Sequence, residues 1–544
     1  LEQCDVKAVF GVISIHNMPI LDAFAVRGNI RFVMARGEAG AANMADAYAR
    51  TTGGLGVCLT STGTAAGNAA GAMVEAQTAG TPLLHITGQI ETPYLDQELA
   101  YIHEARDQLN MLKAVSKAAF RVRSVETALS TMKLAVQTAL TAPTGPVSVE
   151  IPIDIQSTFI PMPTDLSPLP IPVAVPAPEA LDLMADRLAS AKRPMLWLGG
   201  GARHAGAQVK RLLAMGVGVI TSTQGRGVVN EDDERCLGAF SQNKRVEQFL
   251  QTCDALLIAG SRLRSNETFK YALKLPSNLL RIDANPAIEG RSYASELFVC
   301  GDAALALEGL ADRLEGRLHT DPSFLAELKA VREQSRSQLM ADLGPYSAMV
   351  EQLQAVTGRN FSWVRDVTLS NSIWGNRLLT LYHPRAGVHA LGGGIGQGLA
   401  MGIGAAVAAA ETAPERKVFA IAGDGGFILN LGELATLVQE RANLVILLMN
   451  DQRYGVIRNI QDAVYGSRHC YVDLHTPDYT KLADSLGLRH GLVTDLKDFG
   501  KVVDSALSQP GPFLLEVDML SVGNFATQFA GPPNSETKAQ KATA

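Results

Sequence analysis

Short apolar runs alternate with alanine-rich helical patterns along most of the chain. The runs are bounded by glycine and are almost continuously hydrophobic. This pattern is typical of parallel strands that are covered by helices on both faces of the sheet. The sequence therefore predicts an α/β protein built from doubly wound parallel sheets. The predicted strands are residues 55–60, 82–87, 146–151, 195–198, 255–259, 387–391, 418–422, 444–449 and 512–517.

Two changes in composition divide this pattern into three domains. Residues 159–178 carry many prolines, which exclude helix and sheet ladders and predict an extended linker. Residues 321–354 are charged, helical in pattern, and connect the second α/β unit to the third. We expect domains over residues 1–160, 178–318 and 356–525, followed by a C-terminal tail over 526–544, whose last residues, 535–544, are small and polar and are expected to be mobile.

Composition and charge exclude several kinds of protein. The 544 residues are 47% hydrophobic and 19% charged, as in globular proteins with several cores. The net charge is −6 and Lys and Arg form no long run, so no nucleic-acid binding is expected, because phosphate neutralisation needs a basic face. No apolar stretch reaches roughly 18 residues, so no membrane association is expected. Six scattered cysteines predict reduced thiols in a cytoplasmic protein.

A glycine-rich turn directly follows the strand predicted at 418–422. Ligands bind at the carboxyl ends of strands in open parallel sheets, and glycines let a large anion approach the backbone. A predicted crossover helix over 431–441, the strand 444–449 and Asp451 complete the unit. Because a right-handed crossover brings both strand ends to one edge, we expect the carboxylates of Asp424 and Asp451 to converge.

Two converging carboxylates suit a hard divalent cation such as Mg²⁺ that also holds phosphate. The alternative interpretation is a pair of surface acids that cap helices. The motif of Gly423, Asp424 and Gly425 followed by Asn450 and Asp451 resembles the thiamine-diphosphate signature of the pyruvate decarboxylase and acetolactate synthase superfamily. Other parts of the chain are similar to benzoylformate decarboxylase and benzaldehyde lyase, members of the same superfamily.

The resemblance implies a fold of three thiamine-diphosphate-type domains, namely a pyrimidine-binding, a central and a diphosphate-binding domain. It implies that Asp424, Asp451 and the main-chain carbonyl of Arg453 bind Mg²⁺ over the diphosphate. Many members have asparagine where this chain has Asp451, but aspartate still offers an oxygen ligand. The implied cofactor-binding residues are Glu38, Ser370, Asn371, Gly394, Ile395, Gly423, Asp424, Gly425, Gly426, Asp451, Tyr454 and Gly455.

Two of these positions have a more specific implied role. Glu38 begins an alanine-rich helical pattern, and the resemblance implies that its carboxyl group hydrogen-bonds the aminopyrimidine ring and favours its imino tautomer. The alternative is an acid that is stabilised near a helix N-terminus. Ile395 lies in the glycine loop 392–398, which does not match a dinucleotide-binding motif, and the resemblance implies that it bends the cofactor.

Histidines are the candidates for proton transfer to the substrate. His16 follows the first strand and is similar in position to an active-site histidine of benzaldehyde lyase, and His103 and Glu104 replace the Phe-Gln pair of acetolactate synthases. A histidine that titrates near neutrality can move a proton to or from an enamine or an alkoxide. Hydrogen-bonded surface histidines are the alternative. The catalytic candidates are therefore Glu38, His16, His103 and Glu104, whereas His85 and His389 are expected to be structural.

The resemblance implies a thiamine-diphosphate enzyme that decarboxylates small 2-oxo acids non-oxidatively through an enamine intermediate. The alternative is a carboligase or lyase that makes or cleaves 2-hydroxy ketones from aldehydes, and a third possibility is a non-catalytic nucleotide-binding homologue. Because Glu38 and the diphosphate motif come from different subunits in the superfamily, we expect at least a homodimer and favour a homotetramer. Arg262 and Asp283 of the central domain could serve FAD or ADP, although a structural remnant is favoured.

Overall fold

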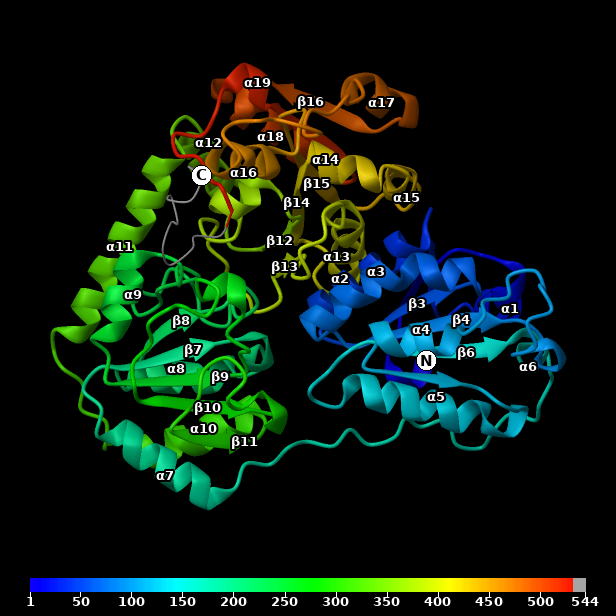
Figure 1. The fold of residues 1–544 in the computed structure, drawn as a ribbon, viewed down its shortest axis with the longest axis horizontal. Coiled ribbons are helices and arrows are strands. Elements are labelled where there is room, and N and C mark those ends of the chain that lie inside the picture. The colour runs from blue at the N-terminus through cyan, green and yellow to red at the C-terminus, as the bar shows by residue number, and fades with distance from the viewer. Residues whose placement is uncertain (532–544) are drawn as a thin grey trace, which may run out of the picture.

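The computed structural model describes residues 1–531, which form three α/β domains, each built on a parallel sheet (Figure 1). Every pairing between the named strands is parallel, and helices cover both faces of each sheet. The predicted fold class is therefore confirmed. The domain limits drawn from composition remain our proposed limits. Residues 532–544 of the predicted tail lie outside the described residues, so its predicted mobility stays a prediction.

The N-terminal domain contains a six-stranded sheet with the strand order β2-β1-β3-β4-β6-β5. The order changes direction between β1 and β3, as in other doubly wound sheets. The strands are β1 (Ala8–Gly11), β2 (Arg31–Met34), β3 (Gly56–Thr60), β4 (Leu83–Gln89), β5 (Ala118–Arg121) and β6 (Val147–Pro152). The helices are α1 (Met18–Arg27), α2 (Glu38–Thr52), α3 (Thr64–Ala79), α4 (Gln108–Val115), α5 (Val125–Leu140) and α6 (Ile153–Gln156).

A segment without helix or strand follows α6 and runs to α7 in the second domain (Figure 1). The central sheet has five strands in the order β11-β10-β9-β7-β8. Its strands are β7 (Pro194–Leu198), β8 (Gly218–Thr221), β9 (Ala255–Ala259), β10 (Leu279–Asp283) and β11 (Leu297–Cys300). Its helices are α7 (Pro178–Ala189), α8 (Gly206–Ala214), α9 (Lys244–Gln251) and α10 (Ala303–Leu314), and α11 (Phe324–Asp342) and α12 (Tyr346–Thr357) lead to the third domain.

The C-terminal sheet has six strands in the order β13-β12-β14-β15-β17-β16. Its strands are β12 (Phe361–Arg365), β13 (Gly387–His389), β14 (Lys417–Gly423), β15 (Leu444–Asn450), β16 (Arg489–Val493) and β17 (Phe513–Asp518). Its helices are α13 (Gly398–Thr412), α14 (Asp424–Leu429), α15 (Glu433–Gln439), α16 (Gly455–Val464), α17 (Tyr479–Leu486), α18 (Phe499–Leu507) and α19 (Met519–Val522).

The N-terminal and C-terminal domains share one hydrophobic core, in which α2 packs against α13 (Figure 1). Both helices are rich in alanine and glycine, so their backbones approach closely. A buried ion network adds polar contacts beside this core: Arg50 pairs with Asp46 and Glu75, and its guanidinium donates to the carbonyl of His389 at 2.6 Å. The C-terminal end of α2 and the end of β13 are therefore held in one arrangement.

No helix within residues 1–531 combines the length and apolarity that crossing a lipid bilayer would need.

Candidate active site

The carboxylates of Asp424 and Asp451 converge at one edge of the C-terminal sheet, as the sequence predicts. β14 and β15 are neighbours in register, with Gly423 opposite Met449. Asp424 begins α14 directly after β14, and Asp451 follows β15. The main-chain N–H of Asp451 donates to Asp424 Oδ1 at 3.4 Å. The parallel pairing of two consecutive strands therefore brings together side chains that are 27 positions apart.

The electrostatics of this pair fit a cation. Burial raises the pKa of Asp451 to about 8, and the charge of Asp424 adds to the effect. Burial also raises the pKa of Asp424, and its Oδ2 atom has no hydrogen-bond partner among the described residues. Two neighbouring carboxylates that repel each other are stabilised when a divalent cation binds both. The residues present therefore fit the predicted Mg²⁺.

The third predicted metal ligand is the main-chain carbonyl of Arg453. The turn that carries it is fixed, because Arg453 Nε donates to the carbonyl of Asp451 at 2.7 Å. Within residues 1–531 no group of three or more His, Cys, Asp or Glu side chains is placed to bind a metal. A cation at Asp424 and Asp451 would therefore complete its coordination with main-chain or non-protein oxygens.

The start of α16 packs closely on the two aspartates. A Cβ atom at Gly455 would lie 2.5 Å from Asp451 Oδ2, so only glycine allows this approach. The ring of Tyr454 lies against Gly425, and Tyr454 N donates to the carbonyl of Val472 at 2.8 Å. The predicted cofactor residues Tyr454 and Gly455 thus form one wall of the carboxylate site.

Ser370 and Asn371 supply further polar atoms that lack partners. They lie at the start of a π-helical turn (Asn371–Gly375), a local geometry that is frequent at functional sites. Ser370 Oγ and Asn371 Oδ1 are both buried, and neither has a hydrogen-bond partner among the described residues. Buried polar atoms in folded proteins are almost always paired. Together with Asp424 Oδ2, these atoms indicate a polar ligand at this end of the sheet.

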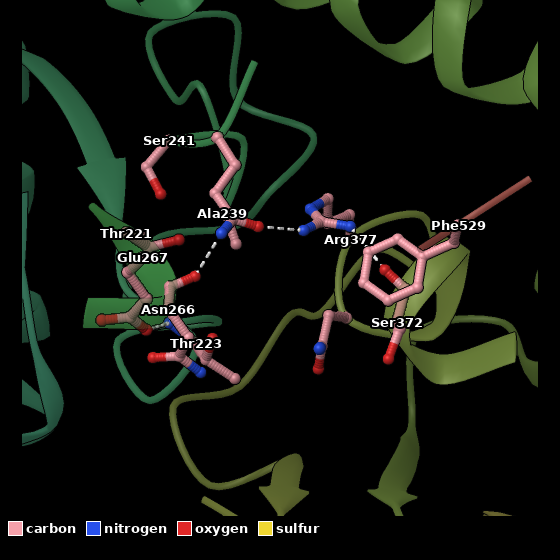
Figure 2. Close-up of a pocket in the computed structure, with 11 residues that line it drawn as sticks. Thr221, Thr223, Ala239, Ser241, Asn266, Glu267, Ser372, Arg377 and Phe529 are labelled. Atoms are coloured by element: carbon pink, nitrogen blue, oxygen red, sulfur yellow. Dashed lines mark hydrogen bonds between the residues drawn. The ribbon is translucent and has the colours of Figure 1, made fainter. Parts of the chain in front are cut away.

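The same π-helical turn borders a polar pocket of about 100 Å³ between the central and C-terminal domains. Figure 2 shows Arg377 and Glu267 on opposite sides of this pocket, with the ring of Phe529 beside Ser372. Arg377 connects the two domains, because its guanidinium donates to the carbonyl of Ser372 at 2.9 Å and to Gln242 Oε1 at 2.7 Å. The turn that carries Ser370 and Asn371 is therefore anchored to the central domain.

The glycine loop that contains Gly394 and Ile395 is held by two buried carboxylates. Glu75 of α3 accepts hydrogen bonds from the N–H groups of Leu391 (2.7 Å) and Gly392 (2.5 Å). Asp366 accepts from Gly396 N with both oxygens, at 3.1 and 3.0 Å, and burial raises its pKa to about 6. The side chain of Ile395 stays partly exposed at the tip of the loop.

Glu38 is the first residue of α2, as predicted, and its carboxylate is partly exposed. Asn68 Nδ2 donates to Glu38 Oε2 at 3.1 Å. The preceding turn is fixed by Glu433 of α15, which accepts from the N–H groups of Arg36 and Gly37, both at 3.1 Å. Among the described residues, no hydrogen bond or ion pair joins Glu38 to Asp424 or Asp451. Glu38 and the two aspartates of one chain thus form separate parts of the candidate site.

The structure brings His16 and His103 together. Their ring centroids are 5.1 Å apart and the rings meet edge-on. Burial and the neighbouring His103 lower the pKa of His16. Glu104 is turned into its own loop, where it accepts a hydrogen bond from Tyr101 N at 2.9 Å. The structure therefore groups the two histidines, while the carboxylate of Glu104 shapes the loop.

Two other histidines form hydrogen bonds within the protein through their ring nitrogens, as expected for structural residues. His85 is fully buried between Thr60 Oγ1 (2.9 Å) and Ser148 Oγ (3.2 Å). His389 Nδ1 lies 3.0 Å from the carbonyl of Arg365. Both rings hold neighbouring strands together.

A cavity of about 480 Å³ lies between the central and N-terminal domains. Arg262 and Asp283, the residues proposed for a nucleotide, both line it, next to Gly200, Gly201 and Gly260. The Arg262 guanidinium donates to the carbonyl of Thr78, and Asp283 Oδ1 accepts from Asn285 N at 2.9 Å. Both side chains thus already have protein partners, and the favoured interpretation, a structural remnant, stays a prediction.

Sequence reasoning missed the residues that position the site, namely Glu75, Asp366, Arg377 and Glu433. Each contacts residues that are distant in the sequence or lie on a loop. Glu433, for example, accepts from an N–H group 397 positions away. The one signal that the sequence offered for this set was the position of Asp366 directly after a strand that ends in the candidate site.

Comparison with known proteins identifies this arrangement. The models of the N-terminal thiamine pyrophosphate (thiamine diphosphate) binding domain, the central domain and the C-terminal thiamine pyrophosphate binding domain of thiamine pyrophosphate enzymes match residues 1–111, 181–310 and 369–517. The three matches lie in the N-terminal, central and C-terminal sheets, respectively. The chain belongs to the thiamine-diphosphate-dependent enzymes.

Its relatives include proteins with different reactions. The probable acetolactate synthase large subunit of Methanocaldococcus jannaschii is 26% identical over 99% of this chain and 95% of its own length. The chloroplastic acetolactate synthase 1 of Nicotiana tabacum is 27% identical over 95% of this chain and 80% of its own length. The probable 2-ketoarginine decarboxylase of Pseudomonas aeruginosa is 29% identical over 94% of this chain and 91% of its own length.

Proposed function

We propose that this thiamine-diphosphate enzyme decarboxylates a small 2-oxo acid without oxidation and releases an aldehyde. The observation that carries the proposal is the juxtaposition of His16 and His103, whose rings are 5.1 Å apart. A decarboxylase must deliver a proton to the carbon that has lost CO₂, and paired imidazoles are suited to this. The relative named as a probable 2-ketoarginine decarboxylase, at 29% identity, supports the same reaction class.

The residues of this chain have the following proposed roles. When bound, thiamine diphosphate supplies the electron sink for the loss of CO₂. Asp424, Asp451 and the Arg453 carbonyl hold Mg²⁺, and Ser370 and Asn371 bind the diphosphate. Glu38 presents a carboxyl group to the pyrimidine ring, and Gly394 and Ile395 face the same ring. His16 and His103 move the proton at the substrate.

We also propose that the working site lies between two copies of this chain in the cytoplasm. Exposed apolar side chains lie within four positions of His16 or His103 in the sequence of the N-terminal domain, and others lie in the glycine loop, at the end of α14 and in α16 of the C-terminal domain. A surface of this kind favours burial against a partner. The first set comprises Ile13, Ile15, Met18, Leu99 and Ile102, and the second comprises Ile395, Leu429 and Ile457. A homotetramer made of two such dimers remains part of the proposal.

Carboligation is the second candidate function. Several relatives are named as acetolactate synthases, which supports a reaction in which a second carbonyl compound replaces the proton. The replacement of Phe-Gln by His103 and Glu104 favours protonation instead. The two reactions share the cofactor residues and differ only in the group that meets the bound substrate.

The test measures CO₂ release from a panel of aliphatic, aromatic and basic 2-oxo acids, with thiamine diphosphate and Mg²⁺, in the presence and absence of an aldehyde acceptor. We expect CO₂ and free aldehyde without an acceptor. CO₂ release that requires the acceptor, with a 2-hydroxy ketone as product, would establish carboligation. No cofactor binding by calorimetry would leave the non-catalytic homologue as the remaining interpretation.

A further inference from the structure

Gln108 is the first residue of α4, and its side chain is buried, with only 1% exposed. Its Oε1 atom accepts hydrogen bonds from Gly63 N at 2.7 Å and from Thr62 Oγ1 at 2.9 Å. Its Nε2 atom donates to the carbonyl of Gly88 at 3.2 Å and to Glu150 Oε2 at 2.9 Å. Both polar atoms of the amide therefore have two partners, which come from the segments that follow β3, β4 and β5 along the chain.

The amide of Gln108 connects the ends of two neighbouring strands. β3 and β4 are paired in parallel, and their register ends with Thr60 opposite Thr87. Gly63 and Gly88 follow that last pair, one on each strand's continuation. A side-chain amide offers one acceptor and one donor group, as a peptide group does, so it can accept from one strand and donate to the other. Gln108 thus fixes the spacing of Gly63 and Gly88 where the ladder between the strands has ended.

Each of these glycines packs against one histidine of the candidate acid–base pair. At Gly88, an added Cβ atom would lie 2.7 Å from the Cβ of His16. At Gly63, which has a φ of 61°, an added Cβ atom would collide with the main-chain carbonyl of His103. Only glycine permits approaches this close. The two glycines that Gln108 holds are therefore the ones that the backbones of His16 and His103 contact.

Few other contacts fix the two histidines relative to each other. Their ring centroids are 5.1 Å apart, but within residues 1–531 no hydrogen bond joins the two residues. His103 is exposed on a loop with local hydrogen bonds, such as that from Glu104 N to the carbonyl of Tyr101 at 2.9 Å. The spacing of the two glycines therefore sets how far apart the histidines lie.

Glu150 fixes the orientation of the Gln108 amide. It is fully buried on β6, and its Oε1 atom forms an ion pair with Arg121. A carboxylate can only accept hydrogen bonds and a main-chain N–H can only donate, so Nε2 of Gln108 must face Glu150 and Oε1 must face Gly63. The site therefore requires an amide at position 108, and neither a carboxylate nor an apolar side chain can form the same contacts.

We infer that Gln108 is a positioning residue for proton transfer, whose amide sets the separation of His16 and His103. The inference deepens the proposed function and rests on it, because it takes the two histidines as the acid–base groups. Gln108 itself exchanges no proton. Without its amide, Gly63 N and the Gly88 carbonyl lose their shared partner, and unpaired buried polar groups move apart to find water. A displacement of about 1 Å is enough to slow a reaction by about 10²-fold.

The first test measures the contact between the two rings. The full-length protein, with its 10 histidines ¹³C-labelled, is studied by NMR without added cofactor, and His16→Gln and His103→Gln assign the two signals. We expect a nuclear Overhauser effect between the two rings in the unchanged protein and its loss in Gln108→Met, which keeps the side-chain length and removes the amide. The His85 signal, from a ring buried between β3 and β6, should persist and show that the sheet is folded. An undiminished ring contact in Gln108→Met would overturn the inference.

Two further variants show whether the amide itself matters. Gln108→Glu keeps the length and the acceptor oxygen but places a carboxylate beside Glu150 and the Gly88 carbonyl, so it should also lose the ring contact. Asn110→Ala is the matched control, because it removes an exposed amide of the same helix that is bonded to Asp107 at 2.6 Å. It should leave the ring contact unchanged. Equal weakening in Asn110→Ala and Gln108→Met would show a general effect of α4 and would count against the inference.

The second test uses turnover with thiamine diphosphate, Mg²⁺ and a 2-oxo acid. Gln108→Met should lower kcat by about 10²-fold, with KM and the cofactor affinity within about threefold of the unchanged protein. Because Gln108 acts through the histidines, the same change in a His103→Ala background should cost less than about threefold more. A full additional loss in that background would indicate a purely structural role and would overturn the inference. If the unchanged protein turns over no 2-oxo acid, the proposed function fails, but the NMR measurement still decides whether Gln108 positions the pair.

Discussion

Asp424 and Asp451 lie in direct contact at the ends of two neighbouring strands, and the N–H of Asp451 donates to Asp424 Oδ1 at 3.4 Å. Asp424 is buried and Asp451 is partly buried, and the charge of Asp424 raises the pKa of Asp451. Repulsion between the two carboxylates destabilises the protein alone, whereas a bound cation would be attracted to both of them. The expected effects of replacing either residue follow from this repulsion.

Replacement of Asp451 by Asn should stabilise the protein in the absence of cofactor. Burial and Asp424 raise the pKa of Asp451 from 3.8 to about 8. A carboxyl whose pKa is higher in the folded state stabilises the fold at low pH, and this contribution is lost as pH rises through about 8. Thermal unfolding without cofactor should therefore show a higher Tm for Asp451→Asn at pH 8–9, by about 2–4 °C per kcal/mol in a domain of this size. An equal Tm for both proteins across pH 5–9 would contradict the repulsion.

Asp424→Ala should lose cofactor binding. The change removes the buried oxygen that has no protein partner, and with it the strongest oxygen ligand proposed for Mg²⁺. We expect calorimetry with thiamine diphosphate and Mg²⁺ to show affinity reduced by about 100-fold or more. Asp495→Ala changes an exposed aspartate that caps a short helical turn and should bind normally. Undiminished binding by Asp424→Ala would remove the metal site from the proposal.

Glu38→Gln separates binding from turnover. The carboxylate is partly exposed and has one hydrogen-bond partner, Asn68 Nδ2, among the described residues, so its replacement by an amide should leave the fold and the diphosphate site intact. We expect cofactor affinity within about tenfold of the unchanged protein and no measurable turnover, because the proposed role of the carboxyl group is at the pyrimidine ring. Asn68→Ala is a useful companion, since it removes the neighbour and keeps the carboxylate. Full activity of Glu38→Gln would show that another group activates the cofactor.

His103→Ala should slow turnover by roughly 10²-fold if the imidazole is an acid–base group. Its ring lies against His16, whereas the loop geometry depends on its backbone, so the loop should persist. The measurement is single-turnover decarboxylation followed by aldehyde release. His204→Ala, which removes an exposed histidine paired with Asp302, serves as control. A rate within twofold of the unchanged protein would reduce His103 to a packing residue.

Arg50→Met should be strongly destabilising. The guanidinium is buried between Asp46 and Glu75, and removing it leaves two carboxylates without their counter-ion. Breaking a buried network in this way typically costs about 3–5 kcal/mol. Chemical denaturation should show this loss, whereas Arg106→Met, which removes an exposed partner of Glu98, should change stability by less than about 1 kcal/mol. Similar midpoints for the two variants would show that the network adds nothing to stability.

The sequence pattern predicts the interior of the fold well and its edges poorly. Continuous apolar runs mark buried strands such as β9 and β15, because both faces of each are covered. β5 and β16 lie at sheet edges, mix polar with apolar residues and are not predicted. One-sided burial weakens the pattern that sequence reasoning depends on.

The sequence likewise predicts one part of the candidate site and not the other. Asp424 and Asp451 could be placed together because the topology of one strand–helix–strand unit fixes both. Glu433 and Glu75 could not, since their contacts with Arg36 and Leu391 depend on the packing of the N-terminal domain on the C-terminal domain. Contacts of this kind follow from tertiary structure and leave no local pattern.

The packing of α2 on α13 has a consequence for the folding of this protein during translation. Arg50 reaches a carbonyl that is 339 positions further along the chain, and the alanine face of α2 has its partner only once α13 has been made. The alanine face of α2 in the nascent N-terminal domain therefore stays exposed to solvent while the entire central domain is synthesised. During translation, that face is the part of the molecule most in need of a chaperone.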